Sequence, residues 1–133
     1  NAPAYPSEFL TGCALLIKKE LIDTIGFLDE HFFLYYEDAD YSLRAARAGF
    51  SCLVVPQARV YHSEESRNNT QKTYFLVYSG LLFFYKWTSP FFRWYLSAYV
   101  TMRRVKNLVD RACGSAEAPQ EVYRAYRAYF YER

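Results

Sequence analysis

The chain has 133 residues, of which 52% are hydrophobic and 20% aromatic, and its formal net charge is +2. This length fits one domain or part of one, and a charge so close to zero excludes a strongly basic protein, so we expect no nucleic-acid partner. Three cysteines without close spacing exclude a disulfide framework and a zinc knuckle, and the N-terminal residues lack the basic and apolar regions of a secretory signal, which together indicate the cytoplasm.

Charge is distributed unevenly along the chain. Residues 1–85 carry 7 basic and 10 acidic side chains, a net charge of −3, whereas residues 86–133 carry 9 and 4, a net charge of +5. The basic part is either a solvated helix face or a surface for anionic partners. The 14 Tyr and 11 Phe indicate apolar surface that meets a missing domain, a partner subunit or a membrane.

The first part of the chain is predicted to contain a loop, a strand and a helix. Residues 3–8 predict a loop because prolines stand among small and polar residues. The apolar run 9–17 is long enough for a buried strand, and Gly12 within it indicates a bulge or a group that closely approaches the backbone. Residues 18–25 predict a short helix that ends at Gly26.

Acidic residues mark the start of a second helix. This helix is predicted to begin near Asp38 or Asp40 and to run to Ala48. Asp40 can cap its N-terminus, and it also stands four residues before Arg44, the favourable acid-before-base order for an ion pair.

Two short strands are predicted after this helix, over residues 52–55 and 59–61, with a turn between them. Alternation along the second strand places His62 at its end, at the edge of the acidic site. Residues 63–72 are rich in polar and charged side chains and predict a loop suited to act as a lid.

The remainder is predicted to be helical, over residues 73–87, 91–112 and 121–132. The first of these helices is apolar nearly all round, but its apolar run is shorter than the roughly 20 residues that span a bilayer. We therefore expect it to be buried against protein, within this chain or in a homo-oligomer, or to lie at a membrane surface.

The acidic residues and a distant histidine carry a candidate site. Glu37, Asp38 and Asp40 follow an aromatic run that ends at Tyr36, and carboxylates are rarely buried unless paired. One acid can take a proton from a hydroxyl nucleophile while His62 helps to hold a divalent metal, and aromatic faces suit a sugar ring. The same residues also have an ordinary interpretation, as helix caps and a strand-end histidine, and both interpretations stay open.

Several segments of the chain, taken in sequence order, resemble the second half of family-2 glycosyltransferases of the GT-A fold, close to the bacterial rhamnosyltransferase-like branch. The resemblance covers residues 5–85 and is carried by residues 9–19, 25–44, 48–50, 55–56 and 58–62. It implies an α/β fold, with the C-terminal portion of a GT-A (Rossmann-like) domain in residues 1–67 and a helical C-terminal extension in residues 68–133. It also implies inversion by single displacement, with a nucleotide-sugar donor and Mg²⁺ or Mn²⁺.

The resemblance implies roles for individual residues. Asp38 matches the catalytic base that deprotonates the acceptor hydroxyl, and Glu37 beside it would contact the acceptor or orient the helix start. Thr11 and Gly12 match the backbone segment that lies against the acceptor and the donor sugar. His62 matches the metal-proximal histidine.

Three further residues are expected near the substrate. Tyr36 offers a ring face to a sugar, and Asp40 is expected to cap the helix beside the site. Arg44 matches the arginine of the helix after the acids, where we expect an ion pair with a site carboxylate rather than direct contact with phosphate.

The chain also departs from the family pattern. The nucleotide-binding half, with its Asp-x-Asp metal motif, does not precede Phe9, so we expect the chain to need such a half and to be inactive alone. Tyr78 and Ser79 stand where relatives often have an Arg-Asn pair. With that missing half, the resemblance implies transfer of a sugar to a saccharide or lipid-linked acceptor in cell-surface polysaccharide synthesis, in the cytoplasm or at the inner face of the cytoplasmic membrane.

Two other functions stay open at this point. The chain could be a non-catalytic module for oligomerisation or membrane docking, built on its helical C-terminal part. A metal-dependent hydrolase could use Glu37, Asp38 and His62, although His31 is the only second histidine available to complete a metal site.

Overall fold

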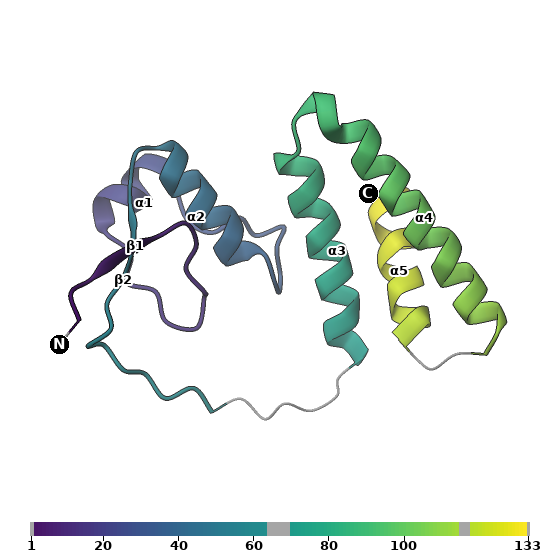
Figure 1. Ribbon diagram of the computed structural model, residues 1–133, viewed down its shortest axis with the longest axis horizontal. Coiled ribbons are helices and arrows are strands. Elements are labelled where there is room, and N and C mark those ends of the chain that lie inside the picture. The colour runs from purple at the N-terminus through teal and green to yellow at the C-terminus, as the bar shows by residue number, and fades with distance from the viewer. Residues whose placement is uncertain (1, 64–69, 115–117, 133) are drawn as a thin grey trace. The chain divides into compact units, whose positions relative to one another are not determined.

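The protein is mostly helical, with five α-helices, one 3-10 helix and a two-stranded sheet in the described residues (Figure 1). The computed structural model describes residues 2–63, 70–114 and 118–132. Two compact units make up these ranges, the first from residues 2–31 and 36–63, the second from residues 32–35, 70–114 and 118–132.

The sheet of the first unit is small and antiparallel. Strand β1 (Tyr5–Ser7) pairs with β2 (Cys52–Val54), and Pro6 stands opposite Leu53. A proline is accommodated because each strand of a two-stranded sheet is an edge strand, whose outer side needs no donor. The strand predicted over 52–55 is therefore confirmed, whereas the loop predicted over 3–8 is wrong at β1.

Two other predicted strands are wrong. Residues 9–17 form turns and irregular backbone with Leu16 fully exposed, and residues 58–63 are irregular and exposed. A strand needs a neighbouring strand for its backbone hydrogen bonds. In the described ranges β1 and β2 pair only with each other, and neither pairs with residues 9–17 or 58–63. The expected α/β architecture is corrected accordingly, because the described residues contain no Rossmann-type sheet.

Two helices complete the first unit. Helix α1 (Lys19–Ile25) ends as predicted at Gly26, whose φ of 77° favours glycine and whose N–H donates to the carbonyl of Ile22 at 2.8 Å. Helix α2 (Glu37–Arg47) begins slightly earlier than predicted, and its N-cap is Tyr36. The capping role predicted for Asp40 is wrong, because that residue lies inside the helix.

The second unit is a three-helix assembly. It contains α3 (Thr70–Trp87), the 3-10 helix η1 (Pro90–Phe92), α4 (Arg93–Ala112) and α5 (Ala118–Tyr131), close to the predicted helix bounds. Helix α5 lies between α3 and α4 and packs against both (Figure 1). The core of the second unit contains one buried residue from each of these three helices, Leu81, Val100 and Tyr126.

The apolar helix α3 is packed into this core rather than set apart. None of the helices in the described ranges combines the length and apolar content needed to cross a bilayer. The loop predicted over residues 63–72, with its role as a lid, lies mainly outside the described residues, since residues 64–69 are not among them.

Residues 32–35 belong to the helical unit although they stand between α1 and α2 in the sequence. The Phe33 ring packs against the Phe75 ring with centroids 4.9 Å apart. The Ser79 hydroxyl, which is fully buried, donates to the Leu34 carbonyl at 2.7 Å. Ser79 therefore ties this segment to α3.

Candidate functional site

The backbone just before α2 is bent in an unusual way. Tyr35 and Tyr36 have φ values of 67° and 68°, the left-handed region that non-glycine residues rarely adopt. Each such residue costs on the order of 1–3 kcal/mol. This bend sets the direction in which α2 begins, so that Glu37 and Asp38 occupy its first turn.

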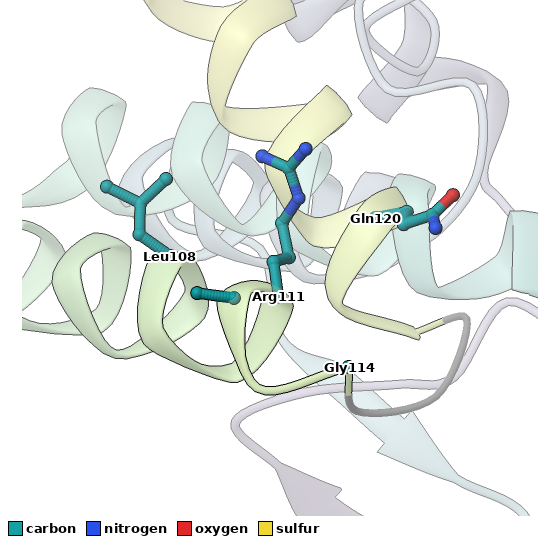
Figure 2. Close-up of a pocket in the computed structure, with 5 residues that line it drawn as sticks. Leu108, Arg111, Gly114 and Gln120 are labelled. Atoms are coloured by element: carbon teal, nitrogen blue, oxygen red, sulfur yellow. The ribbon is translucent and has the colours of Figure 1, made fainter.

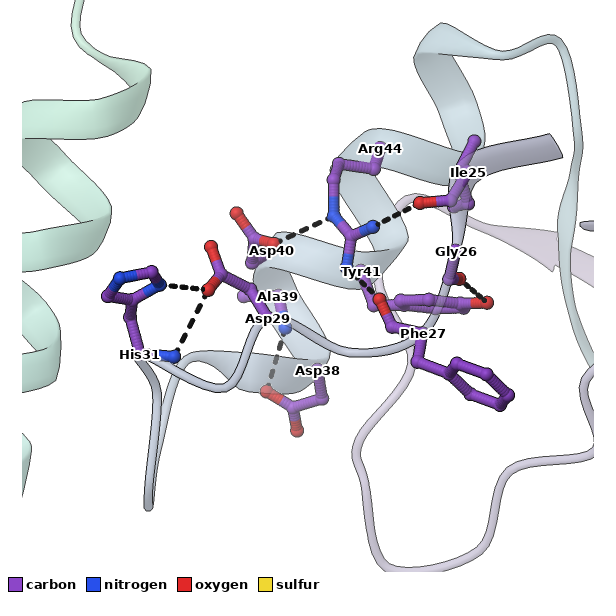
Figure 3. Close-up of polar contacts among 10 residues, drawn as sticks. All are labelled: Ile25, Gly26, Phe27, Asp29, His31, Asp38, Ala39, Asp40, Tyr41 and Arg44. Carbon is purple, nitrogen blue, oxygen red and sulfur yellow. Dashed lines mark hydrogen bonds and ion pairs between the residues drawn. The ribbon is translucent and has the colours of Figure 1, made fainter. Parts of the chain in front are cut away.

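Asp38 joins the start of α2 to the 9–17 segment. Its Oδ2 accepts a hydrogen bond from the backbone N–H of Gly12 at 2.8 Å, and its Oδ1 accepts one from the N–H of Ala39 at 2.8 Å, the second of which Figure 3 shows. The close approach predicted at Gly12 is thus confirmed, and the approaching group is the Asp38 carboxylate. Each carboxylate oxygen keeps a second lone pair, and Asp38 is only half-buried.

Gly12 leaves open the space beside this carboxylate. A Cβ atom built on Gly12 would lie 3.5 Å from both the Cβ and the Oδ2 of Asp38, and 3.7 Å from the Oε1 of Glu37. These are ordinary contact distances, so alanine would fit there, but its methyl group would cover the carboxylates. Glycine leaves the Oδ2 of Asp38 and the Oε1 of Glu37 uncovered on this side.

Glu37 has an unused acceptor atom at this place. Its Oε2 is buried and has no hydrogen-bond partner among the described residues. A buried polar atom without a partner is costly and calls for an explanation, such as a ligand that supplies the missing donor. A hydroxyl group bound between Glu37 and Asp38 would supply that donor.

Arg44 fastens α2 to the end of α1. Its Nε donates to Oδ2 of the fully buried Asp40 at 2.9 Å, and its two terminal nitrogens donate to the carbonyls of Ile25 and Phe27, each at 2.8 Å (Figure 3). The expected ion pair between these two residues is present. The guanidinium already serves three acceptors, so both residues have structural roles here.

Tyr41 reinforces the same junction. Its hydroxyl donates to the Gly26 carbonyl at 3.1 Å, and the Arg44 guanidinium lies 4.9 Å from the centre of its ring (Figure 3). Sequence reasoning missed this residue, because an aromatic side chain inside a helix gives no sign of a particular hydrogen-bond partner.

The remaining predicted residues are less closely associated with the acids. The Thr11 hydroxyl interacts within its own loop, where it donates to the Sγ of Cys13 at 3.3 Å. Tyr36 is half-buried at the N-cap of α2. His62 is exposed on irregular backbone rather than at the end of a strand.

No complete metal site occurs in the part of the chain that the structure describes. No three His, Cys, Asp or Glu side chains in it are grouped so that they could hold an ion. The second histidine, His31, places its Nδ1 2.7 Å from the Oδ1 of Asp29 (Figure 3). A divalent ion at His62 would therefore need further ligands from elsewhere.

A surface hollow in the helical unit is a separate feature. It has a volume of about 460 Å³ and lies where α4 ends and α5 begins (Figure 2), lined by Leu108, Arg111, Ala112, Gly114 and Gln120. The Arg111 guanidinium lies 4.0 Å from the centre of the Tyr123 ring. The lining residues that the structure describes include no carboxylate or histidine, so they offer no acid or base chemistry.

Comparison with known proteins finds partial similarity to one kind of enzyme. Two curated relatives, from two strains of Mycobacterium tuberculosis, are described as N-acetylglucosaminyl-diphospho-decaprenol L-rhamnosyltransferase, and each is 37% identical to this chain over 57 residues. That match covers 43% of this chain and 19% of the relative, so the chain spans about a fifth of the length of the curated relatives it matches. No protein-family model and no solved structure matches the chain.

Proposed function

We propose that this chain is the acceptor-side part of an inverting glycosyltransferase. Together with a nucleotide-binding half, it would transfer a sugar from a nucleotide-sugar donor to a saccharide or lipid-linked acceptor in cell-surface polysaccharide synthesis. Support comes from the partial similarity to a rhamnosyltransferase and from the convergence of Gly12, Glu37 and Asp38. In this proposal residues 1–67 belong to a GT-A domain, residues 68–133 extend it, and the chain is inactive alone.

The observation that carries this proposal is the pair of acids beside Gly12. The Asp38 carboxylate is held by two backbone N–H groups and retains lone pairs, and the neighbouring Glu37 Oε2 is buried without a hydrogen-bond partner among the described residues. A rigidly held carboxylate with free lone pairs is suited to act as a general base toward an acceptor hydroxyl bound within hydrogen-bond reach. An unpartnered oxygen next to it meets the requirement for binding a hydroxyl.

The chemistry assigned to these groups is a single displacement. Asp38 takes the proton of the acceptor hydroxyl while that hydroxyl oxygen forms a bond to the anomeric carbon of the donor sugar. The bond from that carbon to the nucleotide diphosphate breaks, and the diphosphate leaves with the electron pair. Because attack and departure occur on opposite faces, the anomeric configuration inverts.

The other predicted residues support this pair. Gly12 lets the acceptor approach the carboxylates, with Thr11 beside it, and Tyr36 offers a ring face to a sugar. Arg44 and Asp40 act as positioning residues, because their contacts hold α2 against the end of α1.

A divalent ion has an incomplete set of ligands here. His62 is the residue proposed to approach Mg²⁺ or Mn²⁺, but the described side chains do not gather three ligands around one point. Further ligands would have to come from the nucleotide-binding half and from the donor diphosphate, and no step above depends on the ion.

The test uses the full polypeptide that contains the nucleotide-binding half. We expect Asp38→Asn to lower kcat by at least about a hundredfold, the effect of losing a general base, with donor binding unchanged. We expect Glu37→Gln to raise the KM for the acceptor by about tenfold or more, because a hydrogen bond to a charged group is lost. The matched control is Glu30→Gln, which changes an exposed acid of the same unit.

Two outcomes would contradict the proposal. One is full turnover by the Asp38→Asn enzyme. The other is equal loss of activity in the Glu30→Gln control, which would show that the overall charge of the unit, and not the site, is responsible.

A further inference from the structure

Helix α4 leaves one broad apolar face uncovered. Seven large side chains on α4 and the preceding η1 are each 48% to 75% exposed, and we call them the α4 stripe: Phe91, Trp94, Tyr95, Tyr99, Met102, Val105 and Val109. Trp94 and Tyr95 are adjacent and the other successive members stand three or four residues apart, so all seven share one side of the helix. Val100 and Asn107, on the opposite side, are buried.

The helix that carries this stripe also has an excess of positive charge. Helix α4 carries five basic residues and one acidic residue, a net charge of +4. Exposed Arg93 and Arg103 belong to this set, and so does Lys106, whose side chain is 62% exposed and pairs with Asp110 at 2.6 Å. An exposed apolar face on a helix with a net positive charge is typical of a helix that lies in a membrane interface.

Two candidate binding partners for the stripe, a second copy of the chain and an anionic lipid surface, differ in their electrostatic interaction with α4. A second copy of the chain, paired through the same stripe, would bring two helices of net charge +4 together, and like charges across an interface oppose association. An anionic lipid surface would attract these cations, and its acyl boundary would accept the apolar side chains. Aromatic residues, concentrated here in the N-terminal part of the stripe, also favour the headgroup region.

We propose that the α4 stripe docks the protein on an anionic lipid bilayer, with α4 lying parallel to the membrane surface. The stripe would enter the boundary between headgroups and acyl chains, Lys106 beside Val105 would contact anionic headgroups, and the other cations of α4 would add to the attraction. This inference is independent of the proposed transferase activity, because it uses no residue of the acidic site.

The experiment is sedimentation of the 133-residue chain with phosphatidylcholine vesicles, with and without phosphatidylglycerol. We expect binding that requires phosphatidylglycerol and falls as salt is raised, because salt screens the attraction. Met102→Glu should weaken binding by at least about tenfold, since it places a charge in the apolar boundary. Leu76→Glu, at an exposed position of α3 outside the stripe, is the matched control and should leave binding unchanged.

A second measurement follows Trp94 directly. In a Trp87→Phe variant Trp94 is the only tryptophan, and it is 68% exposed. Its fluorescence should move to shorter wavelength when phosphatidylglycerol vesicles are added, because the indole leaves water.

Three outcomes would overturn the proposal. The first is binding that ignores phosphatidylglycerol, and the second is equal weakening by Met102→Glu and Leu76→Glu. The third is a lipid-free dimer that Met102→Glu dissociates, accompanied by no vesicle binding, which would assign the stripe to a second copy of the chain.

Discussion

The two units of this protein are each stabilised internally by a different kind of interaction. In the first unit the buried hydrophobic residues are few, Tyr41 and Ala45 in the described part, and side chains bonded to backbone join its elements. The second unit buries a larger apolar set, which comprises Phe32, Leu81, Leu82, Val100, Ala125 and Tyr126.

This difference matches what each unit presents to its surroundings. Directional hydrogen bonds fix side chains to within narrow limits, which suits a unit that must hold two carboxylates in place. Apolar packing stabilises a helical unit from within and constrains its outer faces little. The second unit can therefore display an apolar stripe without losing its core.

The largest effect is expected when the polar junction of the first unit is broken. Arg44→Met removes the partner of Asp40, which is fully buried, and leaves two backbone carbonyls without their donors. Loss of one member of a buried ion pair costs about 3–5 kcal/mol. We expect the first unit to unfold, as measured by faster amide hydrogen exchange over α1 and α2.

The matched control changes a neighbouring arginine on the same helix. Arg47→Met changes an exposed side chain of α2, and interactions of exposed charged groups contribute at most about 1 kcal/mol, so its effect should be well below that of Arg44→Met. If both variants destabilised α2 equally, helix charge rather than the junction with α1 would be the cause.

A smaller or comparable effect is expected from a cavity in the helical unit. Leu81→Ala removes a buried side chain from the cluster with Val100 and Tyr126, and such changes cost about 2–5 kcal/mol. Amide exchange should accelerate in α3, α4 and α5, whereas α2 keeps its protection. Leu76→Ala, at an exposed site on α3, is the control, and exchange that accelerates equally in both units would show that the two units unfold as one.

The smallest effect is a pH dependence confined to the helical unit. Burial raises the pKa of Tyr126 above its ordinary value of 10.0, an effect that Arg103 opposes. The folded state therefore keeps this proton to higher pH than the unfolded state does, so stability falls as the pH rises through 10.0 and beyond. The midpoint of urea unfolding should decrease over this range.

Substitution separates this tyrosine from the others. In Tyr126→Phe the decrease should be shallower, and in the exposed control Tyr123→Phe it should match the parent protein. If the urea midpoint of Tyr126→Phe fell with pH as steeply as that of the parent protein, Tyr126 would not be the cause of the pH dependence.

Local signals in the sequence predicted much of the fold. The helices follow from apolar periodicity and from the stop at Gly26, which are properties of neighbouring residues. The strands over 9–17 and 59–61 were wrong because a strand depends on a distant partner, and composition alone cannot supply that information. For the same reason β1, which pairs with β2 from the far end of the unit, was missed.

The candidate site shows the same division. The pairing of Asp40 with Arg44 was predictable because it depends on residue type and on a spacing of four residues. The approach of a group to Gly12 was predictable from residue type, but the identity of that group was not, because Asp38 stands 26 residues away. The left-handed turn at Tyr35 and Tyr36 was not, since tyrosine gives no indication of positive φ. The roles of Asp38, Glu37 and His62 in catalysis and metal binding stay predictions.

The attachment of residues 32–35 to α3 limits where the chain can be truncated to obtain one unit alone. Because these four residues belong to the helical unit while their neighbours on both sides belong to the other, no single break in the chain separates the two units cleanly. A protein shortened to end at residue 67 would leave Phe33 without Phe75 and the Leu34 carbonyl without the Ser79 hydroxyl. Its exposed aromatic segment would invite aggregation, so a soluble first unit calls for polar replacements at Phe32 and Phe33.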